Sequence, residues 1–275
     1  MKNNSQQMTT FRQLHEQQAT FILPNAWDVI SAVMFEQCGF KALGTTSAGI
    51  ATSLGYKDGE HIRFEEMLIA VKRIVSSVNI PVTVDIETGY GETTTEIIEN
   101  IKRIIKTGAV GINLEDGTGN ASDPLHDLDA QVEKITAIKQ LSEENPVFLN
   151  ARTDTYWLNV GDEEMKFTET VKRANAFERA GADCIFIPGL TDESTIERVR
   201  KEISVPINLL AAQALPTMET LTNIGIERVS SGSAPFRASA TLVKHIGEEL
   251  INEGTFHRMM DDVMPYGEVT QLMNE

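Results

Sequence analysis

Short apolar runs alternate with longer segments of helical periodicity along the 275-residue sequence. Eight of these runs are rich in Val, Ile and Leu without regular polar alternation, which is typical of strands buried on both faces. They cover residues 21–24, 42–45, 82–85, 110–114, 147–150, 184–187, 207–210 and 228–230. Eight strands that are each followed by a helix predict an α/β fold of the TIM type, a closed (β/α)₈ barrel.

The segments between the runs have the spacing of amphipathic helices. Between residues 64 and 75, for example, apolar side chains recur every three or four positions. Helices are predicted over residues 27–38, 63–78, 94–106, 128–141, 163–180, 192–203, 218–224 and 235–252. A doubly wound open sheet is the alternative, but the first run lacks the Gly-rich phosphate turn of that fold. We expect one domain over residues 1–275, with an N-terminal helical extension over 1–18 and C-terminal helices over 235–275.

Charge and composition exclude several classes of protein. The chain has 24 Lys and Arg against 40 Asp and Glu, a net charge of -16, which argues against a nucleic-acid partner. No apolar run approaches the ~18 residues that cross a bilayer, and residues 1–10 do not resemble a secretory signal. The two cysteines, Cys38 and Cys184, exclude a disulfide framework. We therefore expect a cytoplasmic protein that binds neither membranes nor nucleic acids.

Acidic residues gather at the predicted ends of two strands. Asp85 ends the third run, Glu87 follows it, and Glu115 follows the fourth run. In a barrel these side chains would converge at one mouth, where they cannot all ionise cheaply without a cation. Oxygen ligands suit Mg²⁺ or Mn²⁺. None of the five histidines lies at a strand end, which disfavours zinc.

The alternative role for acidic residues at strand ends is to cap the helices that follow. For Asp116 and Asp154 we favour this capping role. For Asp85, Glu87 and Glu115 together, the convergence favours a metal site.

Arg152 is the one cationic side chain at a predicted strand end. In so acidic a protein, an anionic substrate needs local positive charge, and a metal with a bidentate arginine would supply it. The alternative is a structural salt bridge from Arg152 to Glu115 or Asp154. Nearby, residues 44–49 (Gly-Thr-Thr-Ser-Ala-Gly) can offer a hydroxyl and N–H groups to a carboxylate, and residues 51–60 are long enough for a mobile lid.

Three motifs in register carry a family resemblance. They are residues 82–91 (Val-Thr-Val-Asp-Ile-Glu-Thr-Gly-Tyr-Gly), 113–116 (Asn-Leu-Glu-Asp) and 150–154 (Asn-Ala-Arg-Thr-Asp). Their order and spacing resemble the isocitrate lyase/phosphoenolpyruvate mutase superfamily over about residues 21–208, and in particular a Cys-less member similar to carboxyvinyl-carboxyphosphonate phosphorylmutase.

The resemblance implies a set of site residues. Mg²⁺ (or Mn²⁺) would be held by Asp85, with Glu87, Glu115 and Asp58 contributing mostly through waters. A small 2-oxo or 2-hydroxy carboxylate would chelate the metal. The implied substrate-binding residues are Ser47, Ala48, Gly49, Asp85, Arg152 and Asn208, and the implied catalytic residues are Arg152, Tyr90 and Asp58.

The resemblance also implies a reaction class and an assembly. Members cleave or form C–C or P–C bonds next to a carbonyl through an enolate-like intermediate. They exchange a C-terminal helix between subunits, so we expect a homo-oligomer, a tetramer or a dimer. Residues 235–252 and 255–262 are the candidates for the exchanged segment.

Departures from the family pattern narrow the function. Lyases of the family carry a catalytic Cys after the fourth strand, whereas residues 117–126 (Gly-Thr-Gly-Asn-Ala-Ser-Asp-Pro-Leu-His) contain none. Pro188 and Gly189 stand where methylisocitrate-type lyases have Glu, and Glu87 stands where Asp is usual. We therefore do not expect cleavage of isocitrate or methylisocitrate. We predict a Mg²⁺-dependent lyase or decarboxylase in which Tyr90 or water supplies the proton.

Two alternatives stay open at this point. One is a phosphoenolpyruvate mutase or phosphonopyruvate hydrolase type of enzyme, in which Arg152 and Asn120 would hold a phosphoryl group. The other is a non-catalytic 2-oxo acid binder that keeps the metal site, since a fold does not by itself determine a function.

Overall fold

The apolar runs form one parallel sheet in the computed structural model, which describes residues 4–272. In this part of the chain the sheet has nine strands in the order β1-β9-β8-β7-β6-β5-β4-β3-β2. The strands are β1 (Phe21–Leu23), β2 (Asn25–Ala26), β3 (Leu43–Thr45), β4 (Val82–Asp85), β5 (Gly111–Glu115), β6 (Phe148–Arg152), β7 (Cys184–Ile187), β8 (Ile207–Leu210) and β9 (Arg228–Ser230).

The sheet closes on itself through Pro24. This residue alone separates β1 from β2, and β1 pairs with β9 whereas β2 pairs with β3. Proline has no N–H to donate, so it interrupts the ladder where the first strand changes neighbours. Its carbonyl still accepts the N–H of Gly44 at 2.8 Å. The predicted TIM-type barrel is therefore confirmed, with its first strand in two pieces.

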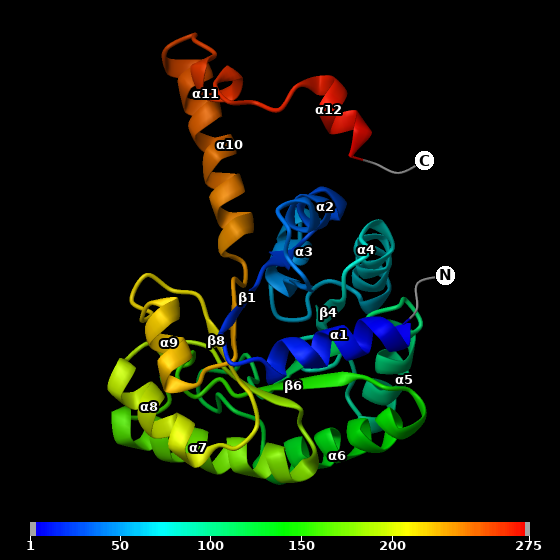
Figure 1. Cartoon of the computed structure of the whole chain (residues 1–275), viewed down its shortest axis with the longest axis vertical. Helices are drawn as coiled ribbons and strands as arrows, with labels where there is room; N and C mark the ends of the chain where they lie inside the picture. Colours follow the sequence, from blue (N-terminus) through cyan, green and yellow to red (C-terminus); the bar gives the residue numbers. More distant parts are fainter. Residues whose placement is uncertain (1–3, 273–275) are drawn as a thin grey trace.

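The described residues also form helices, most of which surround the barrel (Figure 1). They are α1 (Asn4–Glu16), α2 (Val29–Gln37), α3 (Ser47–Ser53), α4 (Phe64–Ser77), α5 (Thr94–Ile105), α6 (Leu128–Glu144), α7 (Glu163–Ala180), α8 (Glu193–Glu202), α9 (Met218–Ile224), α10 (Ala234–Asn252), α11 (His257–Met260) and α12 (Tyr266–Gln271). The sequence pattern did not indicate α3, since its seven residues are too few to show a period.

Alternate residues of each strand point to opposite faces of the barrel wall. On β5, Ile112 and Leu114 pack under the helices and are fully buried. Between them Asn113 points into the barrel, and Asn150 of β6 and Asn208 of β8 hold equivalent buried positions. The middle of the barrel interior is thus polar, whereas Leu23, Phe148 and Cys184 form an apolar cluster with Phe11 of α1 toward the N-terminal ends of the strands.

Helix α1 packs against the N-terminal ends of the strands. Its residues Phe11 and His15 contact Phe21 and Phe148, the first residues of β1 and β6. Figure 1 shows α1 lying along this part of the barrel. The opposite end, at the C-terminal ends of the strands, holds the candidate site.

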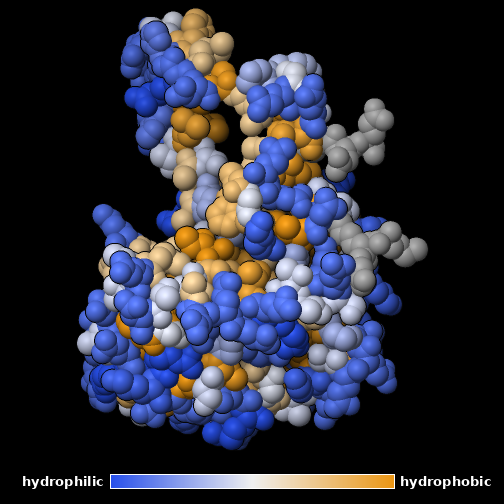
Figure 2. All heavy atoms as spheres, viewed as in Figure 1, coloured by the Kyte–Doolittle hydropathy of each residue, from blue (hydrophilic) through white to orange (hydrophobic). Residues whose placement is uncertain are grey.

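Helix α10 extends away from the barrel and carries α11 and α12 at its far end (Figure 1). Apolar side chains lie exposed along this arm, and Figure 2 shows apolar residues on both sides of the gap next to it. The most exposed of them are Ile251 at 84% and Tyr266 at 86%. Within residues 4–272, no helix is both long enough and apolar enough to span a membrane.

Candidate active site

A cavity of about 100 Å³ lies at the C-terminal mouth of the barrel. Polar residues from six strands or the loops after them line most of it, and a smaller apolar group completes the wall. The polar residues are Asn25, Thr45, Thr46, Ser47, Asp58, Asp85, Asn113, Arg152, Ser230 and Ser233. The others are Ala48, Trp157, Phe186, Pro188, Leu210 and Gly232.

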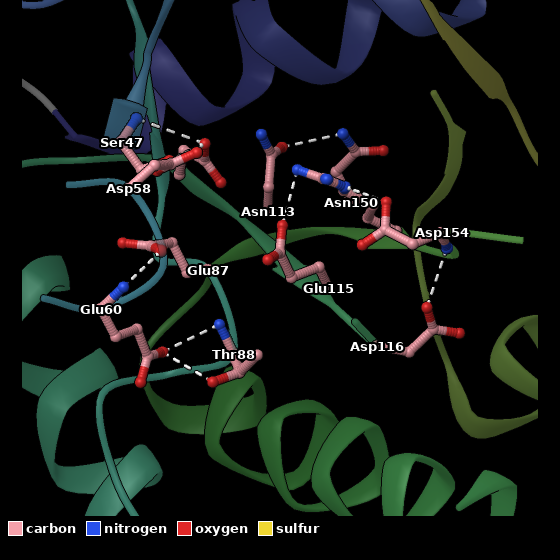
Figure 3. A network of polar contacts seen from close by, with 12 residues as sticks. Ser47, Asp58, Glu60, Glu87, Thr88, Asn113, Glu115, Asp116, Asn150 and Asp154 are labelled. Atoms are coloured by element: carbon pink, nitrogen blue, oxygen red, sulfur yellow. Dashed lines mark hydrogen bonds and ion pairs between the residues drawn. The ribbon is translucent and has the colours of Figure 1, made fainter. Parts of the chain in front are cut away.

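Asp85 is held in the cavity by the loop after β3. Its Oδ2 accepts hydrogen bonds from the Ser47 hydroxyl at 2.8 Å and from the Ser47 N–H at 3.3 Å. The Asp85 N–H donates to the Thr45 hydroxyl at 3.0 Å. Asp58 approaches the same Ser47 hydroxyl at 3.4 Å, and the two side chains lie together in Figure 3. Ser47 thus fixes Asp85 and lies next to Asp58 at one edge of the cavity.

The donor atoms in the cavity fit a hard divalent cation. Among the described residues, both hydrogen bonds to the Asp85 carboxylate use Oδ2, which leaves Oδ1 available. Burial, and next the charge of Asp85, raise the pKa of Asp58, so a cation would relieve this repulsion. Mg²⁺ typically takes one or two carboxylates and fills its remaining positions with water and substrate.

The three acids predicted to converge do not form a ready-made cage. In residues 4–272, no three His, Cys, Asp or Glu side chains are close enough together to hold a metal ion. Glu115 faces Arg152, and Glu87 faces Tyr90. Glu87 and Glu115 are thus each engaged with a protein partner and do not share one ready-made metal site with Asp85.

Arg152 forms salt bridges with both Glu115 and Asp154, the two partners that the sequence offered as alternatives to a substrate. Its Nη1 lies 2.6 Å from Glu115 Oε2, and its Nε lies 2.7 Å from Asp154 Oδ1. Burial alone would lower the pKa of Arg152, but these two carboxylates raise it. Burial raises the pKa of Glu115, and the Arg152 guanidinium opposes that shift. The guanidinium also lies over the Phe186 ring, 5.7 Å from its centroid.

Glu87 joins two loops beside the cavity. Its carboxylate accepts the Tyr90 hydroxyl at 2.5 Å and the Glu60 N–H at 2.7 Å. Glu60 in return accepts hydrogen bonds from Thr88 and from the Tyr90 N–H. Burial raises the pKa of Glu87 to about 7, although its hydrogen bond from Tyr90 opposes this.

Backbone strain concentrates at the same place. Glu60, Glu87 and Tyr90 all have positive φ, at 57°, 51° and 56°. Such conformations are costly for residues other than glycine and often mark functional sites. The hydrogen bonds of Glu60 hold the end of residues 51–60 against the loop after β4. Movement of these residues as a lid stays a prediction.

The capping role predicted for Asp116 and Asp154 is wrong. Asp116 accepts the Asp154 N–H at 2.8 Å and pairs with Arg173 of α7 at 3.1 Å. Helices α6 and α7 are capped instead by Asp127 and Asp162. Both strand-end acids are buried, and they belong to an ion-pair network that supports Arg152.

Of the remaining predicted site residues, Ala48 lines the cavity and the others lie apart from it. The Gly49 N–H donates to Thr46 at 3.3 Å, and a Cβ on Gly49 would lie 2.9 Å from the Trp27 Cβ. Tyr90 contacts Glu87 rather than the cavity.

Asn208 lies within the barrel, where its Oδ1 accepts the Ser230 hydroxyl at 3.1 Å. Asn120, the phosphoryl-holding candidate, makes its contacts inside its own exposed loop, with Thr118 and Ser122.

Several lining residues escaped the sequence prediction. Asn113 lines the cavity and accepts a hydrogen bond from Asn150 at 2.8 Å. Ser230 of β9 and Phe186 of β7 are further examples. Asn113 and Ser230 are polar residues of predicted strands, which could have identified them, whereas Phe186 lies in an entirely apolar run that carries no such signal.

Comparison with known proteins identifies the family of the chain. The family model for phosphoenolpyruvate phosphomutase matches residues 11–251. An uncharacterized protein of Mycobacterium tuberculosis is 35% identical over 260 residues, which cover 94% of each chain. The 2-methylisocitrate lyase of Escherichia coli is 24% identical over 254 residues, 88% of this chain and 84% of that protein.

Solved structures show the same likeness. A Burkholderia cenocepacia protein provisionally assigned as a lyase or mutase has a TM-score of 0.90 and 32% identity, and the match covers 98% of this chain and 95% of that one. A phosphonopyruvate hydrolase complexed with oxalate and Mg²⁺ has a TM-score of 0.85 at 22% identity, over 99% of this chain and 95% of that one, and shares the fold.

Proposed function

The chain belongs to the phosphoenolpyruvate phosphomutase family, and on this premise we propose that it is a Mg²⁺-dependent lyase or decarboxylase of a small 2-oxo or 2-hydroxy carboxylate. The observation that carries the proposal is one cavity lined by Asp58, Asp85 and Arg152. Two carboxylates beside a buried guanidinium can receive a cation and the anion that chelates it.

Asp85 is the proposed direct ligand of the cation, through the Oδ1 atom that its hydrogen bonds to Ser47 leave available. When bound, Mg²⁺ would act as a Lewis acid that stabilises negative charge on the substrate's carbonyl oxygen. Ser47 fixes the orientation of Asp85, and Glu87 and Glu115 would contact waters around the cation.

Arg152 is the proposed partner of the substrate carboxylate. Ion pairs with Glu115 and Asp154 fix its guanidinium at Nη1 and Nε, and Nη2 makes no hydrogen bond to the described part of the chain. Phe186 and Leu210 contribute apolar wall to the cavity and would exclude water from the reacting carbon.

Asp58 is the proposed proton carrier. It lines the cavity beside Asp85, and its Oδ1 lies 3.4 Å from the Ser47 hydroxyl, which places a carboxyl group next to the proposed substrate position. Tyr90 is less suited to this step, because its hydroxyl proton is engaged with Glu87.

A substrate panel with MgCl₂ tests the proposal. Oxaloacetate, methylisocitrate and dimethylmalate would be incubated with the wild-type chain and with Asp58→Asn, and 2-oxo acid products would be followed by coupled assay. We expect turnover of one of the smaller acids, lost in the variant and on chelation with EDTA. Wild-type turnover that is unaffected by EDTA would contradict the proposal.

A phosphonate reaction is the second candidate, favoured by the match to the phosphomutase family model and by the absence of Cys from residues 117–126. Incubation with phosphonopyruvate, followed by ³¹P NMR, separates the two. A new phosphorus signal would favour the phosphonate reaction, and an unchanged spectrum would eliminate it. Oxalate binding without turnover of any compound would instead favour a 2-oxo acid binder.

We also propose a homo-oligomer in which the α10–α12 arm packs on a second copy of the chain. The exposed apolar residues of this arm, among them Ile251, Phe256 and Tyr266, support the proposal. A cytoplasmic location is proposed as well, supported by the free thiols of Cys38 and Cys184.

A further inference from the structure

Arg228 is an unusual residue for the interior of a barrel. It begins β9, and its side chain is the largest fully buried one in the described part of the chain. Its neighbours in register are Phe21 of β1 and Asn208 of β8. Burial of a charged group is costly unless the group is paired.

No carboxylate of residues 4–272 forms an ion pair with Arg228. Its Nε donates to the Ser230 hydroxyl at 3.0 Å, but neither Nη1 nor Nη2 has a protein partner. The amide nitrogen of Asn208 is likewise buried without a partner. Burial lowers the pKa of Arg228 to about 10, so the side chain remains positively charged at neutral pH.

Arg228 is connected to the cavity by a hydrogen-bond relay. Ser230 lines the cavity, accepts a hydrogen bond from Arg228 and donates to Asn208 Oδ1 at 3.1 Å. Because a serine hydroxyl has one hydrogen, these two bonds fix its orientation at the cavity floor.

Arg228 is also connected to the cavity by charge. Burial is the largest influence on the pKa of Arg228 and lowers it. The charges of Cys184 and Asp85 act in the opposite direction and raise that pKa. The Asp85 carboxylate is therefore electrostatically coupled to the buried guanidinium across the barrel interior.

The two arginines near the cavity differ in charge balance. Arg152 is neutralised by Glu115 and Asp154, which both lie within 2.7 Å of it. Arg228 has no such partner. Of these two guanidinium groups, only that of Arg228, beneath the cavity, has a positive charge that no carboxylate of the described residues pairs with.

We propose that Arg228 is a positioning residue that supplies the positive potential of the cavity floor to a bound carboxylate and fixes the Ser230 hydroxyl there. The inference rests on the proposed function, because it assumes that the cavity binds a carboxylate. It adds a specificity element that none of the three sequence motifs contains.

Calorimetric titration with oxalate in MgCl₂ tests this inference. The variants are Arg228→Met, Arg228→Lys and Ser230→Ala, and the control is Arg200→Met. Arg200 pairs with Glu227 at 3.1 Å outside the cavity, so its variant loses a positive charge elsewhere. Melting temperatures of all variants report on folding.

We expect Arg228→Met to weaken oxalate binding about tenfold, Arg228→Lys to retain most of the affinity and Ser230→Ala to weaken it by roughly threefold. Arg200→Met should bind oxalate as the wild type does. If Arg228→Met does not fold, Arg228→Gln, which keeps a polar side chain but no charge, should show the same tenfold loss.

Equal oxalate affinity in the wild type and the Met or Gln variant would overturn the inference alone and leave Arg228 a packing residue. Equal losses in the Lys and Met variants would also overturn it, since charge would then not matter. Absence of oxalate binding by the wild-type chain would overturn the proposed function and this inference with it.

Discussion

Arg152 Nη1 lies 2.6 Å from Glu115 Oε2, and the two residues face each other in register on β6 and β5. In this pair Glu115, an acid at a strand end, holds the Arg152 side chain in place. Because Asp154 holds the Nε of the same guanidinium, the plane of Arg152 is fixed before any ligand arrives. A preorganised guanidinium binds a carboxylate with little further loss of conformational entropy.

Replacement of Arg152 by Lys should weaken oxalate binding in MgCl₂ at least about tenfold, close to 1.4 kcal/mol. Lysine keeps the charge, but its single ammonium cannot reproduce the Nη1 and Nε contacts while leaving a donor for the ligand. Isothermal titration calorimetry measures the effect. Arg198→Lys is the matched control, because Arg198 pairs with Glu164 far from the cavity lining. Wild-type affinity in Arg152→Lys would argue against its role.

Replacement of Asp116 by Ala should destabilise the protein by about 3 kcal/mol, because Arg173 loses its fully buried partner and keeps only the more exposed carboxylate of Glu169. Asp127 is the matched control, since it caps α6 with exposed hydrogen bonds to Asp129 and Ala130. Asp127→Ala should cost about 1 kcal/mol. Urea denaturation followed by circular dichroism compares the two. Equal losses would show that the buried ion pair between Asp116 and Arg173 adds no more stability than an exposed helix cap.

The stability of the chain should fall as pH decreases from about 6.5 toward 3, in part because of His15. Burial, and next the nearby Arg228, lower the pKa of His15 from 6.5 to about 3 in the folded protein. In this pH window the unfolded chain binds the proton and the folded chain does not, so acid favours unfolding. Each pKa unit is worth about 1.4 kcal/mol.

A His15→Phe variant isolates this contribution. Phenylalanine does not titrate and can occupy the aromatic cluster with Phe11, Phe21 and Phe148. Chemical denaturation at several pH values between 4 and 7 should give a shallower loss of unfolding free energy in the variant than in the wild type. Parallel curves would show that His15 does not control this dependence.

Substitution of Ile251 by Asp should shift the protein to a smaller oligomer. Its side chain is 84% exposed on the projecting arm, so the charge costs little in an isolated subunit but disrupts an apolar interface. Sedimentation velocity measures the change, and Glu253→Asp serves as a control on the same arm. A wild-type chain that sediments as a monomer would contradict the proposed assembly.

Much of the barrel could be predicted from the sequence because strands buried on both faces have a distinctive composition. The position of Asp85 and Arg152 at one mouth followed from the same pattern, since parallel strands end at one rim. The split at Pro24 and the short helix α3 could not be predicted. Both depend on which strands become neighbours and on capping by Thr46, which sequence periodicity does not report.

The partners of the site residues were harder to predict than their positions. Asp116 binds Arg173, which lies 57 residues away on α7, so nothing local distinguishes it from a helix cap. Arg228 lies within a predicted strand, yet an arginine pointing into a barrel is contrary to the usual burial preference. Such residues become visible only when the strands are assembled.

Anomalous diffraction from crystals grown with MnCl₂ and oxalate locates the cation and its ligands. We expect one manganese peak bonded to Asp85, with oxalate bridging that ion and the Arg152 guanidinium. The Asp85→Ala protein should show neither feature. A manganese peak away from Asp85, or oxalate bound in the cavity without any metal, would contradict the account.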